Sequence, residues 1–141
     1  MTDASEPRGA LDGLYVLDLS RILAGPTATQ LRGDRGATVS KVENPKTGGD
    51  DTRSWGPNYA RGTDGQPTDL SAYFMSANRN KQSIAVDLST ADGQAIVCQL
   101  AARADVAIEN YKPGGLANYG LDHDTLLAAH PGLVYCSISG F

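Results

Sequence analysis

Apolar residues along this chain occur in short runs that alternate with longer amphipathic stretches. Residues 14–19, which read LYVLDL, form a near-continuous apolar run typical of a parallel strand buried on both faces. Similar runs predict further strands at residues 38–43, 83–87, 106–109 and 133–139. Amphipathic stretches predict helices at residues 26–35, 69–77, 89–103 and 122–129. This alternation predicts an α/β fold with a doubly wound parallel sheet and right-handed crossovers.

Local signals indicate where the predicted helices begin. Pro26 suits a first helical turn, because its missing N–H would have no intrahelical partner there. Ser89 followed by Asp92 resembles a capping box, which predicts Ser89 as the N-cap of the helix that follows. Residues 44–68 are rich in Gly, Pro, Asp and Thr and lack periodicity, so they are predicted to form a long functional or mobile loop.

Composition limits the classes of function. The chain has 141 residues, 40% of them apolar, and a domain of this size buries about two-thirds of its unfolded surface. Its net charge of −4 argues against broad contact with nucleic acid or anionic membranes. No apolar run reaches the length of a membrane span, and the polar residues 1–10 do not resemble a signal peptide. We expect a cytoplasmic protein with a disordered polar terminus at 1–10 and one domain at 11–141.

Cysteine and histidine positions do not indicate a metal site. Cys98 and Cys136 lack the spacing of metal ligands or of a disulfide framework, so both thiols are expected to be free. His123 and His130 lie away from every candidate motif, and surface positions on a helix account for them.

The strongest candidate for a binding site is the segment that reads DVAIENYKPGG, residues 105–115. A buried strand ends at Glu109, and the turn that follows offers an amide, a phenol and a cation from Asn110, Tyr111 and Lys112. Open α/β sheets bind ligands at the carboxyl ends of their strands. The free N–H groups of a helix starting at residues 113–115 would favour an anion at the same place. A solvated surface lysine is the alternative for Lys112.

A nicotinamide or flavin cofactor is not expected. Glu43 ends the second predicted strand, where a ribose-binding acid would lie in a dinucleotide-binding domain. The turn after the first strand, however, carries only Gly25 where several glycines are needed for close approach of a pyrophosphate.

Seven motifs in register resemble the amino-terminal part of the family III CoA-transferases, also described as CaiB/BaiF type. They read LDGLYVLDLSRILAGP, GATVSKVENP, GDDTRSWGP, NRNKQSIAVDL, ADVAIENYKPGGL, YGL and PGLVYCSISGF. The resemblance covers residues 11–141, and the third and fourth motifs are more similar to the formyl-CoA and succinate-hydroxymethylglutarate transferases than to the racemases. It implies a Rossmann-like large domain within an interlocked, ring-shaped homodimer.

The resemblance also implies a reaction. Family members move coenzyme A between carboxylic acids through an aspartyl-acyl anhydride and an aspartyl-CoA thioester, which splits one difficult exchange into easier steps. The nucleophilic aspartate is expected beyond Phe141, so no residue of this chain is predicted to be catalytic, and Asp18 is interpreted as a hydrogen-bonded residue at a strand end. Two alternatives remain: a 2-methylacyl-CoA racemase-like isomerase, and a catalytically silent CoA-binding fragment.

Carried over residue by residue, the resemblance implies CoA contacts along three turns. The implied residues are Leu23, Ala24, Val86, Asp87, Leu88, Ser89, Asn110, Tyr111 and Lys112. The alternatives that the residues themselves leave open are a tight turn without a ligand after the first strand, a core position for Val86 and helix capping for Ser89. Gly25 is expected to allow close approach of the ligand.

Two substitutions depart from the family pattern. Asn44 and Asn118 occupy positions where many relatives have arginine, so cations that could hold a CoA phosphate are absent. This predicts either weaker nucleotide binding or compensation by other cations. The candidates are Arg21, Arg53 and Lys81. Arg53 beside Trp55 could instead belong to a carboxylate pocket, although a packing contact also explains the pair.

Overall fold

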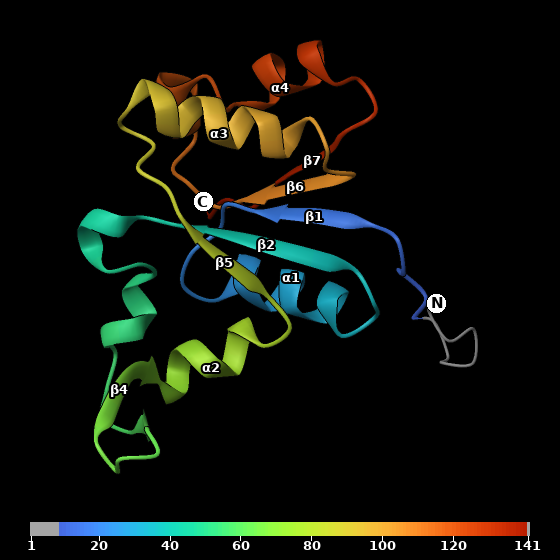
Figure 1. Ribbon diagram of the computed structural model, residues 1–141. Coiled ribbons are helices and arrows are strands. Elements are labelled where there is room, and N and C mark those ends of the chain that lie inside the picture. Colours follow the sequence, from blue (N-terminus) through green and yellow to red (C-terminus); the bar gives the residue numbers. More distant parts are fainter. Residues whose placement is uncertain (1–8, 141) are drawn as a thin grey trace.

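The computed structural model describes residues 9–140, so the prediction for the polar terminus lies mostly outside the described residues. Five parallel strands form the central sheet in the order β5-β2-β1-β6-β7 (Figure 1). The strands are β1 (Tyr15–Asp18), β2 (Thr38–Glu43), β5 (Gln82–Ala85), β6 (Val106–Glu109) and β7 (Val134–Ser137). Each predicted strand is therefore present, with ends that differ by a few residues at most.

Helices cover both faces of the sheet, which confirms the doubly wound α/β fold. The helices α1 (Ala24–Gly33) and α2 (Ala72–Asn78) lie on one side, and α3 (Ala91–Ala101) and α4 (His123–Ala129) on the other (Figure 1). The strands β1, β2 and β5 progress in one direction, and β6 returns to the other side of β1. This reversal creates a switch point between β1 and β6, a place where open α/β sheets bind ligands.

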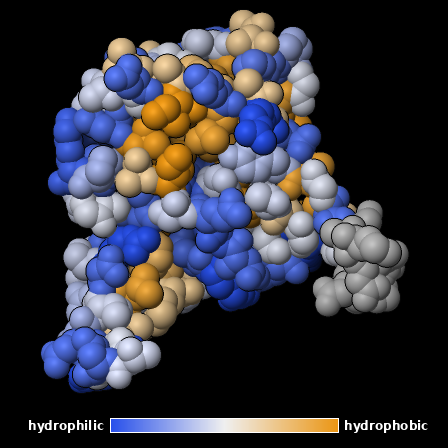
Figure 2. Space-filling model, viewed as in Figure 1, coloured by the Kyte–Doolittle hydropathy of each residue, from blue (hydrophilic) through white to orange (hydrophobic). Residues whose placement is uncertain are grey.

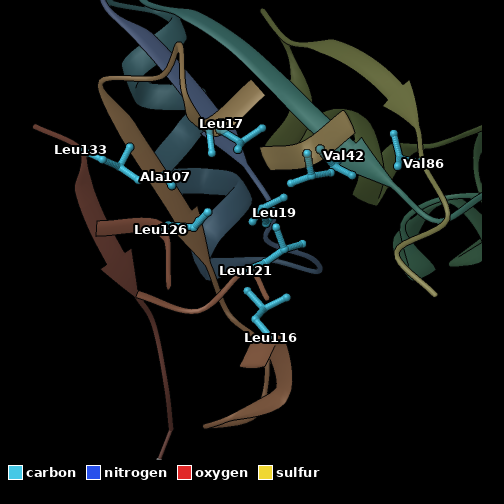
Figure 3. Close-up of a cluster of buried hydrophobic side chains, with 11 residues drawn as sticks. Leu17, Leu19, Val42, Val86, Ala107, Leu116, Leu121, Leu126 and Leu133 are labelled. Atoms are coloured by element: carbon cyan, nitrogen blue, oxygen red, sulfur yellow. The ribbon is translucent and has the colours of Figure 1, made fainter. Parts of the chain in front are cut away.

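The strand β1 is buried on both faces, as its apolar run predicted. Successive strand residues point to opposite faces, and accordingly Val16 packs in one core cluster while Leu17 packs in the other. Figure 3 shows the larger cluster, which includes Leu17, Leu19, Leu116, Leu121 and other buried side chains. Leu17 and Leu121 are completely buried. The two clusters join the sheet to its covering layers.

The segment predicted as one long loop at 44–68 contains regular structure. It holds two 3-10 turns, η1 (Pro45–Thr47) and η2 (Asp51–Ser54), and then an antiparallel hairpin of β3 (Tyr59–Arg61) and β4 (Pro67–Ser71). The hairpin lies apart from the main sheet (Figure 1). Its turn contains Gly65 with a φ of 77°, which glycine adopts without strain. The helix predicted at 69–77 begins only at Ala72, because residues 67–71 belong to the hairpin.

The predicted N-cap of α3 was wrong by one residue. Thr90, and not Ser89, caps the helix, since its Oγ1 accepts a hydrogen bond of 3.0 Å from the N–H of Gly93. The helix predicted after Pro113 is a short 3-10 turn, η3 (Gly115–Tyr119), that follows Gly114 in the left-handed conformation. Pro26 lies in the first turn of α1, as predicted.

Some large hydrophobic side chains are exposed at the surface of the described residues. Figure 2 shows hydrophobic residues gathered near α3 on the face in view. Ile96, which belongs to α3, is a large hydrophobic residue that is 43% exposed. Cys98 and Cys136 are free thiols, as predicted. Within residues 9–140 no helix combines the length and the apolarity that crossing a membrane requires.

Candidate functional site

A cavity of about 300 Å³ opens at the carboxyl ends of β2 and β5. Its walls come from the last residues of β2, from the segments that follow β2 and β5, and from the segments after β1 and β6. The lining residues are Arg21, Lys41, Val42, Glu43, Asn44, Lys46, Gly49, Asp50, Val86, Asp87, Leu88, Ser89, Tyr111 and Tyr119. We refer to it as the edge cavity.

One wall of the edge cavity is apolar. Val42 and Val86 belong to the larger core cluster, and Leu88, Tyr111 and Tyr119 pack against that cluster. The segment after β5 continues alongside β2, because the N–H of Val86 donates to the carbonyl of Glu43, the residue that follows Val42. Figure 3 shows Val42 and Val86 side by side at one end of the cluster. The wall therefore offers apolar and aromatic surface to a ligand.

Another part of the cavity lining is polar and charged, and consists of a cluster of Lys46, Asp87 and Ser89. The ammonium group of Lys46 lies 2.8 Å from Asp87 Oδ2 and donates to Ser89 Oγ, also at 2.8 Å. The hydroxyl of Ser89 donates in turn to Asp87 Oδ1 at 2.7 Å. The hydrogen bond from Lys46, together with those from Ser89, lowers the pKa of Asp87 to about 2. Because Thr90 caps α3, Ser89 is available for this cluster.

The turn after β1 is held in place from two sides. Asn110 accepts a hydrogen bond from the N–H of Arg21 at 2.8 Å and donates to the carbonyl of Arg21 at 2.7 Å. Asp50 accepts a bond of 3.2 Å from the N–H of Ile22, whose φ of 72° is unusual for a β-branched residue. Such strain persists only where surrounding contacts determine it, and it is common at functional sites.

Arg21 reaches the cavity from this turn. Its guanidinium carbon lies 5.6 Å from the centre of the Tyr111 ring, and its Nη1 lies 3.3 Å from Asp51 Oδ2. Burial raises the pKa of Tyr111, so its phenol stays neutral at physiological pH. Arg21 thus contributes an exposed positive charge beside an aromatic surface.

Buried ion pairs support the floor of the cavity. Lys41, only 1% exposed, lies 2.8 Å from Asp50 Oδ2, and Arg53 makes two bonds of 2.8 Å to Glu43. Although burial would raise the pKa of Glu43, its hydrogen bonds from Arg53, Ser83 and the Asp50 N–H lower that pKa to about 2. Glu43 and Asp50 therefore each have a cationic partner beneath the cavity.

A third pair fixes Asp18. Its carboxylate accepts hydrogen bonds from Ser20, Thr29 and Lys81, the last at 3.0 Å. This agrees with the interpretation of Asp18 as a bonded carboxylate at a strand end. Gly25 is needed for packing, since a Cβ there would lie 2.2 Å from the Cβ of Ser20. The expectation that Gly25 serves close approach of a ligand therefore has a simpler structural explanation.

The structure brings together only part of the predicted site. Val86, Asp87, Leu88, Ser89 and Tyr111 line the edge cavity, and their contact with CoA stays a prediction.

The other predicted residues lie elsewhere. Leu23, 49% exposed, precedes α1, and Ala24 is the first residue of that helix; neither lines the edge cavity. Asn110 makes hydrogen bonds to the backbone N–H and carbonyl of Arg21. Lys112 lies in a second hollow beside α4. The turn at residues 110–112 is thus divided between two cavities.

The proposed compensating cations differ in availability. Arg53 and Lys81 are engaged with Glu43 and Asp18, and Arg53 also lies 3.9 Å from the centre of the Phe74 ring. Arg53 therefore has a packing role, and Trp55 contacts Tyr73 instead. Only Arg21 of these candidates lines the cavity.

Sequence reasoning missed Lys46. Asn44, one of the two departures from the family pattern, accepts the N–H of Lys46 and so fixes its backbone. A cation two residues beyond Asn44, just after a strand's carboxyl end, was the available signal.

Comparison with known proteins identifies the family. The model of CoA-transferase family III matches residues 11–141. A succinate–glutarate CoA-transferase of Agrobacterium fabrum is 50% identical over the whole chain, which covers 35% of that protein. The human succinyl-CoA:glutarate CoA-transferase is 48% identical over 93% of the chain, which covers 28% of that protein.

Solved structures agree. A CaiB/BaiF family protein of Brucella suis superposes with a TM-score of 0.88 at 50% identity, over 96% of this chain and 34% of its own. The protein Rv3272 of Mycobacterium tuberculosis gives a TM-score of 0.84 at 38% identity, over 96% of this chain and 35% of its own. The chain spans about one third of the length of the relatives it matches. Sequence and fold together show that this chain belongs to CoA-transferase family III.

Proposed function

We propose that this chain forms the nucleotide-binding part of an enzyme that moves coenzyme A between short dicarboxylic acids. The observation that carries the proposal is the edge cavity, where an apolar wall faces exposed cations at the carboxyl ends of parallel strands. Coenzyme A has a flat base and several phosphate groups, and small-molecule sites of this kind combine apolar surface with a few placed polar groups.

Relatives support the substrate class. The names of relatives refer to succinate, glutarate, mesaconate, oxalate and citramalate, all of which are dicarboxylic acids. The human relative is named for transfer between succinyl-CoA and glutarate, and the Agrobacterium fabrum relative for succinate and glutarate. We therefore expect succinyl-CoA as the donor and glutarate as the first acceptor to test.

The proposal assigns the covalent step to a carboxylate outside this chain. Glu43, Asp50 and Asp87, the acidic residues of the edge cavity, each lie within 2.8 Å of a cationic nitrogen. The pKa values of all three are lowered, and a carboxylate stabilised in this way is a weaker nucleophile. The three are therefore suited to binding and support.

The test of binding is isothermal titration calorimetry of the purified chain with coenzyme A. Changing Leu88 to Glu puts a negative charge on the half-buried apolar wall, and should weaken binding about tenfold or more, equivalent to at least 1.4 kcal/mol. Leu31→Glu is the matched control, because Leu31 is 48% exposed on α1 and does not line the cavity. Equal binding by both variants and the wild type would contradict the proposed site.

A second assay tests the chemistry. The chain should give no transfer from succinyl-CoA to glutarate while it still binds coenzyme A. Turnover above a heat-denatured control would show that the attacking carboxylate lies within these residues. A catalytically silent CoA-binding role predicts the same result for this chain, so the two are separated by assaying it together with the polypeptide encoded immediately downstream.

The interlocked homodimer is also part of the proposal. Val134 on the edge strand β7 is 60% exposed, and Ile84 on the opposite edge strand β5 is 36% exposed. Large apolar side chains on unpaired sheet edges favour association. Size-exclusion chromatography with light scattering should find oligomers, and a monodisperse monomer would count against association.

A further inference from the structure

Lys46 and Asp87 form an ion pair at the mouth of the edge cavity, although 41 positions separate them in the sequence. Lys46 follows β2 and Asp87 follows β5, and these strands are neighbours in the sheet. The side chain of Lys46 is 63% exposed, while that of Asp87 is 21% exposed. The cation is therefore the more accessible member of the pair.

Lys46 retains capacity to bind a ligand. Its ammonium group has three donors, and Asp87 and Ser89 occupy two of them. Its backbone is fixed through Asn44, but the four-carbon stem is free to turn toward a ligand. Of the other cations in the cavity, Lys41 is buried against Asp50 and Arg21 is placed beside Tyr111.

Asp87 is suited to a different group of a nucleotide ligand, the ribose. A carboxylate at the end of a strand in a nucleotide site can accept hydrogen bonds from ribose hydroxyls, and a cation nearby accommodates a phosphate on the ribose. Without a cation, the same carboxylate would repel that phosphate. Lys46 neutralises Asp87 and presents a donor at the same point, so the pair suits a ribose that carries a phosphate monoester.

We propose that Lys46 and Asp87 together select the 3′-phosphate of coenzyme A, with Asp87 facing the ribose and Lys46 binding the phosphate. The inference rests on the proposed function and adds the group of the ligand that this pair reads. It also explains how the site tolerates the asparagine at position 44, because Lys46 supplies a positive charge two residues later.

The experiment compares coenzyme A with 3′-dephospho-coenzyme A by calorimetry. The wild type should prefer coenzyme A, and Lys46→Ala should weaken its binding about fivefold, the size of an exposed charge-assisted contact. The same variant should bind the dephospho compound within about twofold of the wild type. Lys46→Arg should keep the preference, since the charge remains.

Two further variants complete the design. Asp87→Asn should lower the affinity for 3′-dephospho-coenzyme A, because a contact to the ribose is lost. The ratio of the affinity for coenzyme A to that for the dephospho compound should be at least as large as in the wild type. Arg103→Ala is the matched control, because Arg103 is an exposed cation that lines a hollow at the opposite end of the sheet. Circular dichroism melts verify that every variant is folded.

The outcomes separate the two proposals. If the wild type binds neither compound, the proposed function fails and this inference fails with it. If the wild type binds both, but Lys46→Ala weakens both equally or neither, coenzyme A still occupies the site and the selection by Lys46 and Asp87 is overturned.

Discussion

Replacing Asp50 by alanine should cause a large loss of stability, because the buried ammonium group of Lys41 loses its only carboxylate within 4 Å among the described residues and keeps just a hydrogen bond to the Ser20 carbonyl. The Asp50 side chain is completely buried and lies 2.8 Å from the ammonium group of Lys41, which is 1% exposed. It also accepts hydrogen bonds from the N–H of Ile22 and from both Thr52 donors. Removing one member of a buried pair costs about 3–5 kcal/mol, since the remaining charge is not compensated.

The magnitude is large for a single domain. Small proteins have a free energy of unfolding of about 5–15 kcal/mol. With a urea dependence of about 2 kcal/mol per molar, the unfolding midpoint of Asp50→Ala should fall by about 2 M. Far-UV circular dichroism reports the helices, and the fluorescence of Trp55, which ends the turn that Asp50 caps, reports the local structure. Coincident transitions would support two-state unfolding.

Two controls make the result specific. Asp51→Ala removes the neighbouring exposed carboxylate, 40% exposed and 3.3 Å from Arg21, and should cost less than about 1 kcal/mol. The double variant Lys41→Met with Asp50→Ala removes both buried charges and should recover much of the lost stability. An Asp50→Ala midpoint equal to that of Asp51→Ala would refute the reasoning, as would a double variant less stable than Asp50→Ala.

Three further predictions concern pH and helix capping. The pKa of Glu43 falls from 4.5 to about 2 on folding, so its contribution to stability is complete above about pH 4.5 and is lost as the pH falls toward 2. Over this range the urea midpoint of the wild type should decline more steeply than that of Glu43→Gln. Burial, opposed by Asp18, lowers the pKa of Lys81 to about 8, so the unfolded chain binds more protons than the folded chain between about pH 8 and 10.5. Over this range the wild type should gain stability relative to Lys81→Met, and parallel plots of urea midpoint against pH would contradict that pKa. Thr90→Ala should cost about 1 kcal/mol through loss of the α3 cap, and Ser89→Ala clearly less; chemical denaturation that ranks them in reverse would restore Ser89 as the cap.

Much of the candidate site could be located from the sequence, because ligand-binding turns follow buried strands. Of the residues predicted to contact CoA, those at 86–89 and Tyr111 line the edge cavity, while Lys112 lines the hollow beside α4. Their contact with CoA stays a prediction. Lys46 was missed because its partner Asp87 belongs to another strand, and nothing local indicates that the two strands are neighbours.

The sequence by itself determined the order and type of the main elements, the parallel sheet and the family. These follow from local periodicity: the run around Leu17 marks a doubly buried strand, and Pro26 marks a helix start, whatever the rest of the chain does. Only the tertiary structure decided that β5 pairs with β2, that Lys41 is buried against Asp50, and that Lys46 meets Asp87. These contacts join residues far apart in the sequence, so they depend on how the strands and helices pack together. For the same reason the sequence does not distinguish Lys41, which is buried in an ion pair, from Lys46, which is exposed beside the cavity.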